Sequence, residues 1–298
     1  MTSRPARYPL AIIGAGALGL HFAARLAARG PVAVVARSAV RAAALRAGVR
    51  VGDADFQPDA FGPDRLPEAD WVIILVKAGD TADAARTALA LRPRGVLSLQ
   101  NGLVENVLCE ACGALPVGQG ITTEGAFRDA DRVVPSGAGD TLLPPGFEAV
   151  ADLLVAAGLR ARVEPDILAA RLAKLLVNVA INPLAALFRV PNGALLEVPH
   201  RALLDALVAE AWPVLRAAGL QLDEAAARER VIAVATATAA NRASMLQDVL
   251  AGRRTEIDAI TGALLAMAEA QGVDLPTHRA MFTLVTRLWV GLQSDITG

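Results

Sequence analysis

The sequence has 298 residues, a length that favours two domains over one. Its formal net charge of −1 provides no overall positive field, so we expect neither nucleic acid nor an anionic membrane surface as a partner. The purely apolar runs, such as residues 71–76, have the length of strands, whereas a membrane helix needs about 20 apolar residues. Glycines interrupt the apolar patch near the N-terminus, which therefore does not resemble a secretory signal, and we expect a cytoplasmic protein.

In the first half, short apolar runs alternate with alanine-rich helical stretches. The runs 11–13, 32–36, 71–76 and 95–99 have the pattern of buried parallel strands, and helices are expected at 18–29 and 81–89. This alternation predicts an α/β fold with a Rossmann-type, doubly wound parallel sheet over residues 1–165. Near its end, the stretch VVPSGAGDTLL predicts an antiparallel hairpin that closes the domain.

The first expected strand leads directly into a glycine-rich loop and then into a helix. The loop consists of Gly14, Ala15, Gly16, Ala17, Leu18 and Gly19. In such a loop the first glycine permits a tight turn, the second lets the backbone approach a pyrophosphate, and the third allows close helix packing. Because the strand and the helix flank it at the proper spacing, we expect these six residues to bind a dinucleotide.

The second expected strand ends in Arg37 and Ser38 rather than in Asp or Glu. An acidic residue at that point would bond the ribose 2'-hydroxyl of NAD, whereas an arginine suits the 2'-phosphate of NADP. The pattern therefore predicts NADPH/NADP+ as the cofactor. The alternative is that Arg37 is a solvated surface residue.

Two cysteines, Cys109 and Cys112, form a C-x-x-C pair. A zinc site needs four ligands, and the three histidines are scattered along the chain, so we expect no metal site. We assign the two cysteines no function.

The second half, residues 166–298, has helix-period sequence almost throughout, interrupted by proline and glycine. It predicts an all-α C-terminal domain. Its apolar faces could form a homodimer interface or could all be internal.

Lysine is almost absent from the chain, since it occurs only at positions 77 and 174. A bias toward arginine could explain the scarcity but not the location of the two lysines. Arginine cannot replace lysine as a proton donor, because its pKa stays above about 12 while that of lysine can be shifted by burial.

Lys174, Asn178 and Asn182 follow one another at intervals of four residues. Steps of four drift by only about 40° around a helix, so the three groups form one polar stripe on an apolar helix. Such a stripe needs partners, and a binding cleft for a small polar substrate provides them. Structural satisfaction within a buried helix is the alternative.

A second polar segment runs from Asn241 to Asp258 and includes Ser244 and Glu256. Thr255 followed by Glu256 also resembles a helix start, with Thr255 as the cap and the acid in the first turn. Glu256 is therefore a candidate for either capping or chemistry.

Taken together, these segments resemble the ketopantoate reductase (2-dehydropantoate 2-reductase) family over nearly the whole chain. The resemblance rests on their order: GAGALG, the arginine after the second strand, VKA, QNG, GITT, AKLLVNVAINPLAAL, PNG, SMLQD and RTEID. It implies NADPH-dependent reduction of 2-dehydropantoate to (R)-pantoate, a step of pantothenate and coenzyme A biosynthesis. The substrate would be a small 2-keto acid.

The resemblance also implies a role for individual residues. Lys174 would be the general acid that protonates the C2 oxygen, and Glu256 would fix the lysine or the substrate. Substrate contacts would come from Asn101, Asn178, Asn182, Asn192 and Ser244. Asn101 and Lys77 would also line the cofactor site.

Two other functions remain open from the sequence. One is an opine or β-hydroxyacid dehydrogenase of the same architecture that acts on another small 2-keto or hydroxy acid. The other is a dinucleotide-binding sensor without catalysis, which the presence of Lys174 and Glu256 disfavours. Glu124, in the segment after Gly120, is an acid without an assigned role.

Overall fold

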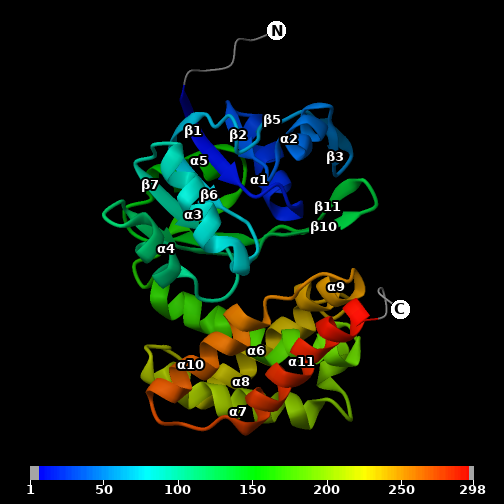
Figure 1. Cartoon of the computed structure of the whole chain (residues 1–298). Coiled ribbons are helices and arrows are strands. Elements are labelled where there is room, and N and C mark those ends of the chain that lie inside the picture. Colours follow the sequence, from blue (N-terminus) through cyan, green and yellow to red (C-terminus); the bar gives the residue numbers. More distant parts are fainter. Residues whose placement is uncertain (1–6, 295–298) are drawn as a thin grey trace. The chain divides into compact units, whose positions relative to one another are not determined.

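The computed structural model describes residues 7–294, with side chains through residue 288. The chain divides into two compact units, Met1–Ile167 and Leu168–Gly298. Figure 1 shows the sheets in the first unit and helices alone in the second.

The first unit is built on a six-stranded sheet with the order β5-β2-β1-β6-β7-β8. Every pairing in this sheet is parallel. Its strands are β1 (Arg7–Ile13), β2 (Val32–Val35), β5 (Asp59–Phe61), β6 (Glu68–Ile74), β7 (Gly95–Ser98) and β8 (Val117–Gln119). The order reverses between β1 and β6, which is where a doubly wound sheet opens a crevice at the carboxyl ends of its strands.

Helices cover both faces of this sheet, because its alternate residues are apolar on both sides. The helices are α1 (Ala17–Ala27), α2 (Ala39–Arg46), α3 (Thr81–Ala90), α4 (Glu105–Cys112) and α5 (Glu148–Ala156). One core joins Leu10 and Ile12 of β1 to α1, α2 and α5. The other joins Ala11 and Ile13 to α3 and α4. The predicted doubly wound fold is thereby confirmed.

The remaining strands form two smaller sheets, with the orders β10-β11-β3-β4 and β13-β12-β9. Their bounds are β3 (Val49–Val51), β4 (Ala54–Phe56), β9 (Ile121–Thr122), β10 (Gly125–Asp129), β11 (Arg132–Gly137), β12 (Asp140–Leu143) and β13 (Arg160–Val163).

The hairpin predicted within VVPSGAGDTLL is wrong. β11 pairs antiparallel with β10, whereas β12 pairs with β9 and β13 in the other sheet. Between β11 and β12 the chain crosses closely over another segment, since a Cβ on Gly139 would lie 2.1 Å from the carbonyl carbon of Thr123. The glycines that suggested a chain reversal therefore allow the chain to cross from one sheet to the other.

Between residues 168 and 294, the described part of the second unit is helical, as predicted. Its elements are α6 (Ile167–Phe188), η2 (Asn192–Leu196), α7 (Arg201–Ala217), α8 (Glu224–Ala237), α9 (Ser244–Leu250), the π-helix η3 (Asp258–Gly262), α10 (Ala263–Ala270) and α11 (Pro276–Ser294). By length and hydropathy α6 could cross a membrane, but 56% of its apolar window is buried in the protein, as in the core helix of a globular unit.

Candidate active site

The glycine loop follows β1, and each of its three glycines meets a different environment. A Cβ on Gly14, whose φ is 121°, would lie 2.6 Å from the backbone carbon of Leu75, and one on Gly19 would lie 1.9 Å from the carbonyl oxygen of Gly14. A Cβ on Gly16 would meet no atom within 4 Å. The first and third glycines therefore allow close backbone packing, while the second leaves its backbone open to a ligand. This arrangement fits a pyrophosphate at the start of α1.

Arg37 lies at the carboxyl end of β2, immediately beside the glycine loop. Ile13 and Val35 are partners in the β1–β2 ladder, and the Gly14 amide donates to the carbonyl of Val35 at 3.1 Å. The exposed Arg37 follows two residues later, and Ser38 caps α2 by accepting from the Arg41 amide at 3.2 Å. The local fold thus places the cationic side chain of Arg37 next to the glycine loop, on the β2 side of β1.

Lys77 and Asn101 follow β6 and β7, at the same edge of the sheet. A buried glutamine braces the two connections: Gln100 Nε2 donates to the carbonyl of Val76 at 3.1 Å and to Thr81 Oγ1 at 2.9 Å. A second buried glutamine, Gln119, donates to the carbonyl of Gly102 at 2.7 Å and accepts from the Val104 amide at 3.0 Å.

Sequence reasoning assigned no role to these two glutamines, although both directly end or follow buried strands. A polar residue at the carboxyl end of a parallel strand could have indicated a role near the ligand site, because the crevice of such a sheet lies there. Their amides hold the backbone on both sides of Asn101. They are positioning residues for the loops that carry Lys77 and Asn101.

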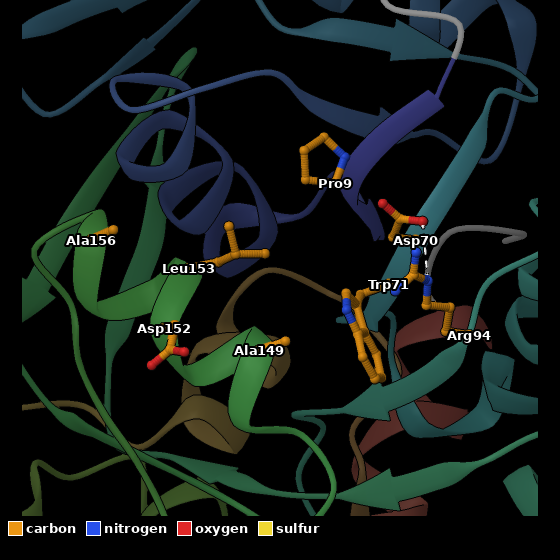
Figure 2. Close-up of a pocket in the computed structure, with 8 residues that line it drawn as sticks. All are labelled: Pro9, Asp70, Trp71, Arg94, Ala149, Asp152, Leu153 and Ala156. Carbon is orange, nitrogen blue, oxygen red and sulfur yellow. Dashed lines mark ion pairs between the residues drawn. The ribbon is translucent and has the colours of Figure 1, made fainter.

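A hollow of about 430 Å³ lies elsewhere on the first unit, between α5 and the strands (Figure 2). Pro9, Asp70, Trp71 and Arg94 line it; Asp70 and Trp71 lie in β6, and Arg94 directly precedes β7. Arg94 and Asp70 form an ion pair at 3.4 Å across its wall. Since the glycine loop follows the carboxyl end of β1, whereas Pro9 is near the amino end of that strand, this hollow is separate from the glycine loop.

In the second unit, Lys174 lies half-buried in α6. Burial lowers the pKa of its ammonium group from its ordinary value to about 8, while the charge of Glu256 opposes this by favouring the protonated form. A lysine with such a pKa can release and recover a proton near neutral pH. A shifted pKa beside a specific charged partner is a common feature of catalytic sites.

Glu256 reaches Lys174 from a segment more than 80 positions later in the sequence. It lies two residues before the π-helix η3, and its carbonyl accepts the amides of Ala259 and Ile260 at 3.1 Å each. The expectation that Thr255 caps a helix here is wrong, because the N-cap of η3 is Ile257 and no side chain bonds the cap. Single turns of π-helix are frequent at functional sites.

The two asparagines of the predicted stripe lie on α6 with Lys174, four and eight residues after it. Asn178 is half-buried and Asn182 is 7% exposed. Most of their neighbours on the helix are buried apolar residues. The stripe is therefore confirmed as three polar side chains on one side of a core helix.

Asn192 is brought next to the segment that precedes Ser244. Its backbone amide donates to the carbonyl of Asn241 at 3.0 Å, and its Nδ2 donates to Thr238 Oγ1 at 2.9 Å. Its buried Oδ1 has no hydrogen-bond partner among the residues that the structure describes. Thr238, which sequence reasoning missed, thus orients the Asn192 amide, while Ser244 is exposed at the start of α9.

The environment of Cys112 does not favour a reactive thiol. Cys109 and Cys112 are both free thiols near the end of α4, and burial raises the pKa of Cys112. A reactive thiol would need the opposite shift. Within residues 7–294, no group of three His, Cys, Asp or Glu side chains is placed to hold a metal ion.

Two family models match this chain. The model described as ketopantoate reductase PanE/ApbA matches residues 10–146, and the one for the C-terminal part of the same family matches residues 166–288. The 2-dehydropantoate 2-reductase of Archaeoglobus fulgidus is 35% identical over 296 residues, which cover 94% of this chain and 98% of that protein.

Solved structures of similar fold include a PanE/ApbA family ketopantoate reductase from Ralstonia eutropha. It is 29% identical, with a TM-score of 0.83 over 95% of this chain and 99% of that one. D-mandelate dehydrogenase with NADH and anilino(oxo)acetate has a TM-score of 0.88 over the same shares, at 22% identity, and so shows the fold alone. The family models and the relatives that align along nearly its full length place this chain in the PanE/ApbA family of ketopantoate reductases.

Proposed function

We propose that this protein reduces 2-dehydropantoate to (R)-pantoate with NADPH. The observation that carries the proposal is Lys174, whose pKa burial lowers to about 8 beside Glu256, on a helix whose buried residues are mostly apolar. Membership of the ketopantoate reductase family supports the reaction, and the name of the Archaeoglobus fulgidus relative supports the substrate.

The cofactor binds at the glycine loop. The open backbone at Gly16 and the amides at the start of α1 receive the pyrophosphate, and Arg37 binds the 2'-phosphate that distinguishes NADP from NAD. When bound, the nicotinamide supplies the hydride that reduces the ketone. Lys77 and Asn101 stand on loops at the same edge of the sheet and line this site.

Lys174 supplies the proton. Near neutral pH its ammonium group is mostly protonated, so it donates a hydrogen bond to the C2 carbonyl oxygen and transfers the proton as negative charge develops there. Glu256 keeps the amine in the protonated form that the reaction needs. After each turnover, a pKa of about 8 lets the amine recover its proton from solvent near neutral pH.

The substrate is held by amides and a hydroxyl group. Asn178 and Asn182 bond its polar groups from α6, Asn192 accepts a hydroxyl hydrogen at Oδ1, and Ser244 bonds the carboxylate. Thr238 Oγ1 accepts a hydrogen bond from Asn192 Nδ2. This bond fixes the amide so that Asn192 Oδ1 stays available to the substrate. In this proposal residues 1–165 bind the cofactor and residues 166–298 provide the acid and most substrate contacts.

The enzyme acts on a small molecule in the cytoplasm, in pantothenate and coenzyme A biosynthesis. The homodimer considered from the sequence stays a prediction, which light scattering coupled to size-exclusion chromatography would measure.

The decisive experiment is an assay of NADPH oxidation with a panel of 2-keto acids. The panel contains 2-dehydropantoate, its analogue without the hydroxymethyl group, and the aromatic 2-keto acid that corresponds to mandelate. We expect the highest kcat/KM with 2-dehydropantoate. Turnover of the aromatic acid but not of 2-dehydropantoate would assign the chain to another dehydrogenase of the same fold.

A further inference from the structure

The start of η2, which carries Asn192, is held closely against the end of α8. The amide of Gly193 donates to the carbonyl of Ala239 at 3.0 Å, next to the bond from the Asn192 amide to the carbonyl of Asn241. A Cβ on Gly193 would lie 2.7 Å from the Cβ of Ala239, so a larger residue would prevent this approach. The backbone of Asn192 therefore has a defined position relative to α8.

The hydroxyl group of Thr238, which directly follows α8, makes two hydrogen bonds with fixed roles. Its Oγ1 lies 2.7 Å from the carbonyl oxygen of Val234, four residues earlier. A carbonyl oxygen only accepts, so the single hydroxyl hydrogen of Thr238 is donated to Val234. Toward Asn192 Nδ2, which is 2.9 Å away, the same hydroxyl oxygen can then only accept.

These two bonds determine which end of the Asn192 side-chain amide faces Thr238. Nδ2 is the donor of that amide, so it lies at Thr238, and the acceptor Oδ1 lies on the other side. Oδ1 is buried without a hydrogen-bond partner among the residues that the structure describes, and Asn192 as a whole is 8% exposed. A buried acceptor in this state is unfavourable until a donor reaches it.

The polar groups of a keto acid differ in whether they can provide that donor. Its carboxylate and its ketone only accept hydrogen bonds, whereas a hydroxyl group also donates one. We propose that Thr238 is a positioning residue that makes the site selective for 2-keto acids with a hydroxyl group, because it fixes Asn192 as an acceptor. The inference rests on the substrate site proposed above. An acid without the hydroxyl group leaves Asn192 Oδ1 unsatisfied and is a poorer substrate.

The test compares two substrates of the full chain with NADPH: 2-dehydropantoate and its analogue with a hydrogen atom in place of the hydroxyl group. The measured quantity is the selectivity ratio, which is kcat/KM for the first acid divided by kcat/KM for the second. Thr238→Val keeps the shape of the side chain but makes neither hydrogen bond, so the amide can turn and present Nδ2. We expect it to lower the selectivity ratio about tenfold and to change kcat/KM for the analogue by less than about twofold.

Two further variants separate selectivity from stability. Thr238→Ser keeps a hydroxyl group and should retain most of the selectivity ratio. Thr236→Val is the matched control, because the exposed Thr236 of α8 also donates to the carbonyl four residues earlier, that of Ile232, at 2.8 Å. Its loss should leave the selectivity ratio unchanged. If Thr238→Val does not fold, Thr238→Ala takes its place.

A double-mutant cycle shows whether Thr238 acts through Asn192. Asn192→Ala removes the acceptor and should lower the selectivity ratio at least as much as Thr238→Val does. When Asn192 is already absent, adding Thr238→Val should change the ratio by less than about twofold.

A wild-type selectivity ratio near one, or an unchanged ratio in Thr238→Val, would overturn the selectivity role. An equal fall in kcat/KM for both acids would also overturn it, because that result indicates a general loss of structure. A further large fall in the double variant would overturn the positioning role, since Thr238 would then act without Asn192. A wild-type protein that reduces neither acid would instead overturn the proposed function, so the two failures are distinguishable.

Discussion

The two units carry candidate functional residues of different kinds. In the first unit the candidate cofactor-binding surface is mainly backbone: three glycines, the amides at the start of α1, and the ends of parallel strands. In the second it consists of side chains on helices, and Lys174 obtains its pKa of about 8 from burial and from a residue far away in the sequence. A backbone site is encoded in a short motif, whereas a side-chain site depends on how distant helices pack.

The largest expected effect tests the candidate side chains of the second unit. Lys174→Met should lower kcat by about 10² to 10⁴-fold, because the general acid is lost. Lys174→Arg should be almost as impaired, since arginine keeps the charge but cannot release the proton. Steady-state kinetics measure the effect, and unchanged NADPH affinity shows that the fold is kept. A variant with wild-type kcat would remove Lys174 from this role.

The second prediction concerns the cation after β2. Arg37→Glu should lower the ratio of kcat/KM for NADPH to that for NADH by about 10 to 100-fold, because the carboxylate repels the 2'-phosphate and accepts the 2'-hydroxyl. Kinetics with both cofactors give the ratio. Arg29→Glu makes the same charge change at an exposed position after α1 and should leave the ratio as it is. An unchanged ratio in Arg37→Glu would contradict NADP selection by this residue.

The third prediction separates two roles of glycine in the loop of the first unit: leaving space for a ligand at Gly16 and allowing close backbone packing at Gly19. Gly16→Ala should leave the melting temperature near that of the wild type and raise the NADPH dissociation constant about tenfold, because its Cβ meets only open space in the protein. Gly19→Ala should lower the free energy of unfolding by about 1 to 3 kcal/mol, since its Cβ would collide with Gly14.

Thermal melts and fluorescence titrations measure both variants. Gly30→Ala is the control, because that glycine also has open space around it and lies away from the loop. Equal melting temperatures for the Gly16 and Gly19 variants would contradict the distinction.

The smallest expected effect, a loss of about half of kcat/KM at pH 8, tests the environment of Lys174. The ammonium form is the acid, so kcat/KM for ketone reduction should be constant well below pH 8, fall to about half at pH 8, and decrease about tenfold per unit well above it. Oxidation of pantoate should increase over the same range, because it needs the neutral amine. Glu256→Gln removes the charge that raises the pKa, so the break should move to lower pH. A profile that is flat to pH 10 would show an ordinary lysine.

Much of the site could be predicted because its motifs are local. The loop from Gly14 to Gly19 follows from steric limits on a turn between a strand and a helix, and the stripe of Lys174, Asn178 and Asn182 follows from the helical period. The hairpin within VVPSGAGDTLL could not be predicted, because glycines permit both a reversal and a crossing, and only the contact with Thr123 selects the crossing. Thr255 failed as a cap because the chain begins a π-helix at that point.

The sequence by itself determined the doubly wound sheet, the helical second half, the glycine loop between β1 and α1, and the scarcity of lysine that directed attention to Lys174. These depend on periodicity, on the conformational freedom of glycine and on residue chemistry, all of which act over a few neighbouring residues. Only the tertiary structure decided that burial and Glu256 set the pKa of Lys174, that Gln100 and Gln119 brace the loops around Asn101, and that Glu124, just before β10, pairs with His21 of α1. Solvent exclusion and contacts between distant segments exist only once the chain has folded, so no local pattern encodes them.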